Sequence, residues 1–470
     1  MGYLVACGAV LAWAVANKGA VLPADRFTSA LAFAVIALVL FLLARRSSLA
    51  PRLSPWIRWP ALLLPVYAAL QCVPLPLAVL RVLSPARAEQ IDALVPVAGR
   101  MRFAPLSVMP SATLRLAVTM AACLLIFLLI RELAWRRPEC QWLLAFPLIF
   151  VAALEAAIGL VQYFSAWPDG IARGTYVNRN HFAGLLEMAL PFAVLYPVTV
   201  ILRNRSRRRS PAGPVLKAAP FLALAGLILA GIIYSFSRMG SVASLVSLFV
   251  MGTVPFGARL SPGRRWIAIG SVALIVLASF ALLPPYRLIM RCAEITATDT
   301  LTSEGRMELW GETLPLIATY PVFGCGLGGF ESAFREFKIS EPLIRDDYAH
   351  NDYLQYLAEM GTVGFLLAAL LIVTLFRAAA HAASRPEPET CWLGLATTGA
   401  MTAILLHSLA DFNLYIPANA MSLAWITGIA SGLEFSFHPL PPWSALGTPV
   451  LELKPLVVPS ISLESDRPST

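Results

Sequence analysis

Four strongly polar residues stand directly before a long apolar run in this chain. The segment reads YVNRNHFAG, so Asn178, Arg179, Asn180 and His181 precede a hydrophobic stretch that begins at Phe182. Amide and guanidinium groups bind anionic oxygen atoms, and a histidine can exchange a proton near neutral pH. The segment is therefore a candidate binding site at the mouth of a hydrophobic helix.

Three further segments carry side chains of the same kind. Ser237 and Arg238 stand in YSFSRMGS, in a tight turn between two apolar runs, Arg306 stands in GRMELW, and His350 and Asn351 begin HNDYLQYL. Arginines near a membrane surface suit a phosphate or diphosphate, because a guanidinium binds such oxygens in bidentate fashion and stays charged. A histidine beside them can accept a proton from a hydroxyl nucleophile.

Each of these residues also has a simpler interpretation. An arginine at the interface can extend to water, and Arg306 can pair with Trp310 four residues later. Asn351 or Asp352 can cap a helix. The run PVFGCGLGGF, which contains Gly326, can offer N–H groups to an anion or serve only as a turn. Helix caps and surface charges do not explain why all these residues fall on one side of the bilayer, which is the observation that favours a site.

Composition predicts the elements that position these residues. Of 470 residues, 58% are hydrophobic and 13% are charged, which is typical of an integral membrane protein and well below the roughly 25% charged residues of soluble domains. The apolar runs are continuous rather than alternating, so helices and not strands are expected. We expect an all-α polytopic protein with about twelve transmembrane helices near residues 1–16, 27–43, 60–80, 113–131, 141–163, 182–202, 218–236, 240–257, 266–284, 353–376, 392–409 and 416–435.

Basic residues in the short loops predict the orientation. The exits of the even-numbered spans are basic, as in the runs at 131–137 and 203–209, which places both termini in the cytoplasm and the candidate residues on the outer face. Four arginines in the loop near 81–112 depart from the pattern without reversing it. The net charge of +9 is thus mostly a topology signal, and no nucleic-acid partner is indicated.

The chain divides into a transmembrane domain over 1–435, with one large outer loop near 285–352, and a proline-rich tail over 436–470 that is expected to be disordered and cytoplasmic. In the loop, a helix from Ser303 should end before Pro321. The stripe Phe330, Phe334 and Phe337 should pack on the membrane domain or rest in the interface.

Cys292 and Cys325 share this loop and could pair, although their spacing does not demand it. No CxxC or HExxH motif signals a metal, and no cofactor is expected.

Polar residues within or near the spans are functional candidates by default. These are Glu155, Glu187 and Glu359, together with His407, Asp411 and Asn413 of HSLADFNLYIP. Hydrogen bonding at helix ends, or a structural pair between helices, accounts for them equally well.

The order of these motifs resembles the superfamily of O-antigen ligases and polymerases. The motifs are NRNHFAG, SRMG, GRMELW, YPVFGCGLGGF and HNDYLQYLAEMGTVG. The resemblance covers roughly residues 105–435 and extends to WaaL-like ligases, Wzy-type polymerases and related protein O-oligosaccharyltransferases. It implies a GT-C-type architecture in the bacterial inner membrane, with the active site facing the periplasm.

The resemblance also implies an activity. The enzyme would move a glycan, without a metal, from an undecaprenyl-diphosphate-linked donor to an acceptor hydroxyl on a growing glycan, a lipid A core or a protein, with membrane lipid as a further partner. Arg238 and Arg306 would hold the diphosphate and His350 would activate or position the acceptor. The remaining donor-site residues would be Asn178, Arg179, Asn180, His181, Ser237, Asn351 and Gly326.

Two other classes of protein remain open from the sequence. A twelve-span secondary transporter fits the composition, but transporters usually place polar sites near the membrane midplane, whereas these motifs gather at one face. A catalytically inactive relative that serves as a scaffold is the third possibility, and the presence of Arg238, Arg306 and His350 together argues against it.

Overall fold

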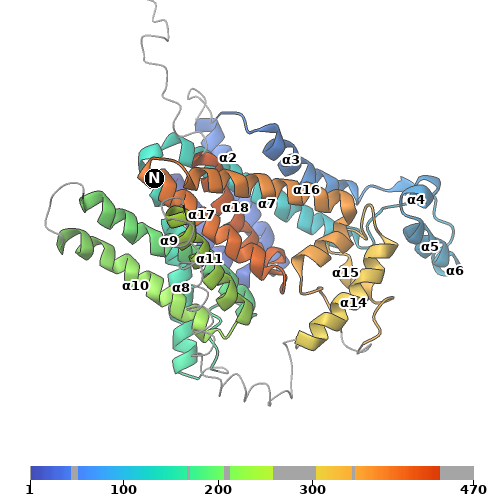
Figure 1. Cartoon of the computed structure of the whole chain (residues 1–470). Helices are drawn as coiled ribbons and strands as arrows, with labels where there is room; N and C mark the ends of the chain where they lie inside the picture. The colour runs from blue at the N-terminus through green and yellow to red at the C-terminus, as the bar shows by residue number, and fades with distance from the viewer. Residues whose placement is uncertain are drawn as a thin grey trace, which may run out of the picture. The chain divides into compact units, whose positions relative to one another are not determined.

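The computed structural model describes residues 2–43, 51–166, 170–205, 212–257, 303–340 and 345–433. Within these ranges the chain is almost wholly helical (Figure 1). The β-structure described is one short antiparallel pair, β1 (Leu75–Pro76) with β2 (Phe103–Ala104). This agrees with the all-α membrane protein that the continuous apolar runs predict.

Most of the described residues lie in long helices. In chain order these are α1 (Gly2–Ala16), α2 (Pro23–Leu43), α3 (Pro55–Leu70), α7 (Pro110–Arg136), α8 (Phe146–Phe164), α9 (Arg179–Arg205), α10 (Ala212–Tyr234), α11 (Arg238–Gly257), α14 (Ser303–Thr319), α16 (Asp352–Ala383), α17 (Pro388–His407) and α18 (Pro417–Leu433). Short 3₁₀ turns connect some of them: η1 (Lys18–Ala20), η2 (Pro138–Leu144) and η3 (Asn413–Tyr415). Among the described helices, seven are long and apolar enough to cross a membrane, namely α2, α7, α8 with the end of η2, α9, α10, α16 and α17.

The expected spans coincide with helices, with two exceptions. The range 266–284 lies outside the described residues. The range expected at 60–80 is wrong at its end, because α3 stops at Leu70 and Pro74 and Pro76 follow. A proline lacks the N–H of the helical ladder and its ring clashes with the preceding turn. Two prolines within three residues therefore oppose a further helical turn, whereas Pro60 and Pro65 stand singly inside α3. The total of twelve spans stays a prediction.

Helices α9 and α17 form the centre of the bundle. In each, 72% of the apolar window is buried, against 22% in α2 and α16. A helix that is apolar on all sides is buried on all sides, and α9 packs against α8, α10, α11, α17 and α18. The polar residues at the start of α9 are therefore surrounded by protein rather than by lipid.

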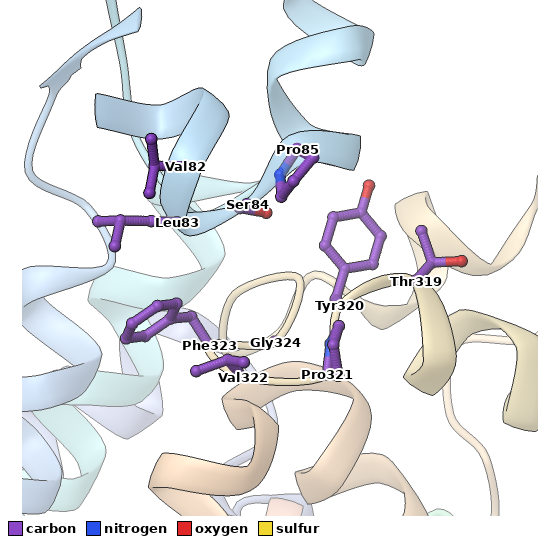
Figure 2. Close-up of a pocket in the computed structure, with 10 residues that line it drawn as sticks. All are labelled: Val82, Leu83, Ser84, Pro85, Thr319, Tyr320, Pro321, Val322, Phe323 and Gly324. Atoms are coloured by element: carbon purple, nitrogen blue, oxygen red, sulfur yellow. The ribbon is translucent and has the colours of Figure 1, made fainter. Parts of the chain in front are cut away.

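The loop near 81–112 folds into a small unit that the sequence does not predict. It consists of α4 (Leu77–Leu83), α5 (Pro85–Ala93) and α6 (Val95–Ala98) with the strand pair, around Leu80, Ile91 and Leu106. This cluster packs against Phe323 of the large loop, so α4–α6 and the residues after α14 lie at the same end of the bundle (Figure 1). A cavity of about 150 Å³ separates residues 82–85 from residues 319–324, with the Tyr320 ring along one side (Figure 2).

The large loop packs on the membrane domain, which is one of the two arrangements expected for its phenylalanine stripe. Helix α14 ends at Thr319, before Pro321, as predicted. Phe330 and Phe334 of α15 (Phe330–Phe334) stack with ring centroids 4.8 Å apart and are buried with residues of α14 and α16. Cys325 has a free and buried thiol, while Cys292 and the tail 436–470 lie outside the described residues.

Candidate active site

Polar side chains from separate parts of the chain converge on the carboxylate of Asp411. Asp411 lies between α17 and η3 and is completely buried. Asn180 donates a hydrogen bond from Nδ2 to Oδ2 at 2.6 Å, and the N–H of Phe412 donates to Oδ1 at 2.9 Å. The start of α9 is thereby tied to the loop that follows α17.

Three groups that can carry positive charge surround the same carboxylate. His350 Nδ1 lies 3.4 Å and His181 Nε2 3.5 Å from Oδ1, and Arg306 Nη2 lies 3.9 Å from Oδ2. These distances exceed those of ordinary N–H···O hydrogen bonds, which run to about 3.2 Å, so the groups face Asp411 without saturating it. The side chains of His350 and Arg306 are 22% and 19% exposed, against 6% for His181. His350 and Arg306 are thus the members that a substrate can reach.

The charge of Asp411 is set by these neighbours. Burial alone would raise the pKa of Asp411, but the close approach of His181 and His350 outweighs it and holds the pKa well below its ordinary value. Asp411 is therefore a carboxylate at neutral pH. One buried anion faces an arginine and two histidines, which leaves the cluster suited to a further anion.

The ring of Phe412 fixes the positions of both histidines. His181 and His350 meet it edge-on, with centroid distances of 4.6 and 4.8 Å, and Tyr348 stacks on it at 4.0 Å. Edge-to-face contacts of this kind restrict ring rotation, so the two imidazoles are held on either side of Asp411.

The start of α16 places His350. Asn351 caps this helix, since its side chain accepts the N–H groups of Tyr353 and Leu354. The N–H of Asp352 donates to the carbonyl oxygens of Ser408 and Asp411, and its Oδ2 accepts from the Ser408 hydroxyl at 2.7 Å. His350 itself has φ of 49°, a left-handed conformation that costs a non-glycine residue about 1–3 kcal/mol. The surrounding hydrogen bonds maintain this conformation and point the ring at Asp411.

Helix α14 places Arg306. Trp310, one turn further along, donates from Nε1 to the carbonyl oxygen of Ala349 at 2.9 Å. This bond fastens the helix beside the residue that precedes His350. Trp310 thus docks α14 on the chain before α16, and Arg306 faces Asp411.

The remaining predicted residues lie around this cluster or apart from it. Asn178 accepts the N–H of Asn180 and so begins α9, and Arg179 follows, half-buried. Ser237 caps α11 by accepting the N–H of Gly240 at 3.2 Å, and Arg238 is exposed at the first residue of that helix.

The turn that carries Arg238 lies near the start of α9. A methyl group on Gly240 would come within 2.6 Å of Ala183, two residues after His181. Arg238 therefore lies at the same end of the bundle as the Asp411 cluster.

The glycine run around Gly326 binds a carboxyl group, but this group belongs to the protein. The N–H of Gly328 donates to Glu359 Oε2 at 2.7 Å and the N–H of Phe330 to Oε1 at 3.2 Å, while the N–H of Gly326 donates to the Glu359 carbonyl oxygen. Gln355 and the Tyr415 hydroxyl complete the shell of this carboxylate. Gly326 (φ 102°) packs so closely on Ser107 that a side chain there would collide with it. The structure thus uses Gly326 to fold the loop onto α16.

The other intramembrane carboxylates have partners within the bundle. Glu187 of α9 pairs with His407 of α17 at 3.0 Å, both completely buried. Glu155 accepts the N–H and hydroxyl of Thr175 at 2.8 and 2.9 Å. Both pairs fit the structural interpretation.

Asp411 is the residue whose importance the sequence does not reveal. It was one of several polar residues in HSLADFNLYIP, and helix-end hydrogen bonding explained it equally well. The available signal was positional: an acidic residue between two apolar helices, on the same predicted face as two histidines and two arginines. Its central place depends on the packing of α9, α14 and α16, which the sequence motifs alone do not reveal.

The fold and this cluster define a multi-pass membrane protein with a cationic site at one end of a helical bundle. Residues 222–369 match a family model described as O-Antigen ligase. The match confirms the resemblance in the motifs and supports a ligase- or polymerase-type role in glycan biosynthesis. The matched range contains Arg238, Arg306 and His350, while Asn180, His181 and Asp411 lie outside it. No curated protein matches the chain.

Proposed function

We propose that this protein transfers or polymerises a glycan from an undecaprenyl-diphosphate-linked donor to an acceptor hydroxyl at the periplasmic face of the bacterial inner membrane. The observation that carries this proposal is the convergence of Asn180, His181, Arg306 and His350 on one buried carboxylate. Together with the family match, this geometry supports a glycan transferase. No metal takes part in the reaction proposed.

In this reaction the acceptor oxygen attacks the anomeric carbon of the donor sugar. The bond from that carbon to the diphosphate breaks, and the diphosphate leaves with the electron pair. Arg306, with Arg238 at the same end of the bundle, stabilises the charge that develops on the diphosphate, since guanidinium groups bind phosphate oxygens in pairs.

His350 accepts the proton of the acceptor hydroxyl. Its Nδ1 faces the Asp411 carboxylate, which orients the ring and stabilises the protonated imidazole. The other nitrogen is then the base. Asn180 and His181 hold Asp411 from the opposite helix, and Asn178 and Arg179 line the mouth of the donor site. Ser237 and Asn351 support the site by capping the helices that carry Arg238 and follow His350.

The test is glycan profiling of cells that lack the protein. The cells are complemented with wild type, Arg306→Ala or His350→Ala at equal membrane levels. We expect wild type alone to restore long glycan chains, with the variants accumulating lipid-linked donor. The acceptor that loses its glycan distinguishes ligase from polymerase from protein glycosylase. Full restoration by both variants would refute the proposal and favour a transporter or a scaffold.

A further inference from the structure

A buried arginine at the start of α2 lies beside the candidate site without a role in the reaction above. Arg26 is 9% exposed, and its Nε has no hydrogen-bond partner among the described residues. Its Nη2 makes one long contact, 3.5 Å to the carbonyl oxygen of Val21. A buried guanidinium carries five N–H donors and is costly to leave unsatisfied, so this arrangement points to an anionic partner from outside the chain.

The connection before α2 is packed against the site. Gly19 in η1 is so close to Tyr176 and Ile416 that a methyl group there would lie 2.9 Å from each. Lys18, Gly19 and Ala20 all have positive φ, which for the two non-glycine residues is a strained conformation. The hydroxyl oxygen of Thr175, which contacts Glu155, also lies 2.9 Å from the carbonyl oxygen of Val15. The chain thus adopts a tight turn that brings the start of α2 beside the start of α9.

Arg26 lies within electrostatic range of an aromatic stack that contacts the Asp411 cluster. It lies within electrostatic range of Tyr348, and Tyr348 stacks on Phe412, the ring that both histidines contact. Arg115 of α7 lies within electrostatic range of Arg26 as well. Helices α2 and α7 pack together, which holds the two arginines near each other. In the part of the chain that the structure describes, neither guanidinium forms an ion pair with a carboxylate.

We propose that Arg26 and Arg115 bind phosphate oxygen atoms, as a second phosphate site beside the Asp411 cluster. Two guanidinium groups that no described carboxylate pairs with are matched by the charge and oxygen geometry of a phosphate. The occupant is a phosphate group on a lipid, carried by the donor or by a phospholipid headgroup. That the donor supplies it rests on the proposed function; that a phosphate binds there does not.

The experiment measures binding rather than transfer. Full-length protein is placed in nanodiscs of phosphatidylcholine, and undecaprenyl diphosphate is titrated as the probe. We expect Arg26→Gln with Arg115→Gln to raise the Kd about tenfold or more, the loss typical of one charge-assisted contact. Arg100→Gln, an exposed arginine of the α4–α6 unit, is the matched control and should bind like wild type. Equal affinity of the double variant and wild type would overturn the proposal.

Two further arms identify the occupant and separate this proposal from the proposed function. In nanodiscs containing phosphatidylglycerol, competition that weakens probe binding to wild type but not to the double variant would show a headgroup in the site. Undiminished binding would support the donor. If the protein shows no transfer activity but the double variant still loses binding, the phosphate site stands and the transferase falls. If transfer occurs and binding is unchanged in the double variant, the transferase stands and the phosphate site falls.

Stability provides an independent check. Because the Arg26 guanidinium is buried and poorly satisfied, Arg26→Gln should leave the Tm unchanged or raise it. Arg87 is the comparison, since it is also 9% exposed but donates to Pro105 and Gln90. Arg87→Gln should lower the Tm. A fall in Tm for Arg26→Gln equal to that for Arg87→Gln would mean that Arg26 is a structural residue, and would count against the phosphate site.

Discussion

Two buried carboxylates in this protein are held in opposite ways. Glu359 accepts hydrogen bonds from two backbone N–H groups, the Gln355 amide and the Tyr415 hydroxyl, at 2.7 to 3.2 Å. Asp411 faces His181, His350 and Arg306 at 3.4 to 3.9 Å, with one short hydrogen bond to each oxygen, from Asn180 and from the N–H of Phe412. The first carboxylate has neutral and closely bonded partners, while the second also faces an arginine and two histidines at longer range.

The difference separates a carboxyl group that holds the fold, Glu359, from one that orients the groups of the candidate site, Asp411. Neutral donors that saturate a carboxylate hold a loop in place, and none of these donors remains available to a ligand. Cationic groups that only approach a carboxylate keep donors available, so they can turn to a substrate phosphate or hydroxyl. The glycine run that the sequence offered as an anion site belongs to the first kind, and the residues around Asp411 to the second.

The largest expected effect comes from removing the proposed base. His350→Ala should lower the rate of glycan transfer about a thousandfold, the range typical for loss of a general base. The measurement is the initial rate with purified protein and lipid-linked donor. His381→Ala is the control, because this histidine lies in the last turn of α16, far along the helix from His350, and should retain activity. Activity of His350→Ala near wild type would remove histidine from the mechanism.

A smaller loss is expected when the shape of a cation is changed and its charge is kept. Arg306→Lys should reduce transfer about a hundredfold, since an ammonium cannot form the paired hydrogen bonds of a guanidinium with a diphosphate. Arg335→Lys, an exposed arginine paired with Glu331, should be without effect. If Arg306→Lys were fully active, a point charge would be sufficient near Asp411.

The sequence predicts the helices and the residues around Asp411, but it does not predict the central place of Asp411 itself. The apolar runs predict the helices, the motifs predict the family, and the polar residues at span ends predict Asn180, His181, Arg306 and His350 as one group. The helices and the family are confirmed, because hydrophobic periodicity and motif chemistry are local. The four polar residues lie together in the structure, and their roles in a site stay a prediction. Asp411 as the shared centre depends on helix packing across 231 residues from Asn180, which local patterns do not encode.

The glycine run shows why the rest could not be predicted. Gly326 and its neighbours have the composition of an anion-binding loop, and they do bind a carboxylate. Which anion they bind is decided by the break in α16 at Gly361 (φ 61°), whose backbone lies against Val322 and Gly324. That contact brings the loop to Glu359. Likewise the fold of α4–α6 depends on Phe323, over two hundred residues further along the chain.

Changing Glu359 tests the structural half of the comparison. Glu359→Gln replaces one acceptor oxygen by an NH₂ group facing N–H donors, and should cost roughly 2 kcal/mol of unfolding free energy through unsatisfied buried groups. The Tm in detergent should fall, while transfer per folded molecule stays near wild type. Glu331→Gln removes only ion pairs with Arg335 and Arg345 near the surface and should cost under about 1 kcal/mol. Loss of activity without loss of stability in Glu359→Gln would reverse the assignment of the two carboxylates.

The smallest effect concerns the charge of Asp411 and its dependence on pH. The pKa of Asp411 is held below its ordinary value of about 3.9, so its carboxylate stabilises the folded state fully above about pH 5. That contribution is lost as the pH falls through the folded pKa, because protonation then ends the interactions with His181 and His350. The Tm difference between wild type and Asp411→Asn should therefore be smaller below about pH 4 than at pH 5, by a few degrees. Buffers of equal ionic strength keep screening the same across the series. A difference that does not change with pH would mean that the geometry of Asp411, rather than its negative charge, holds the cluster together.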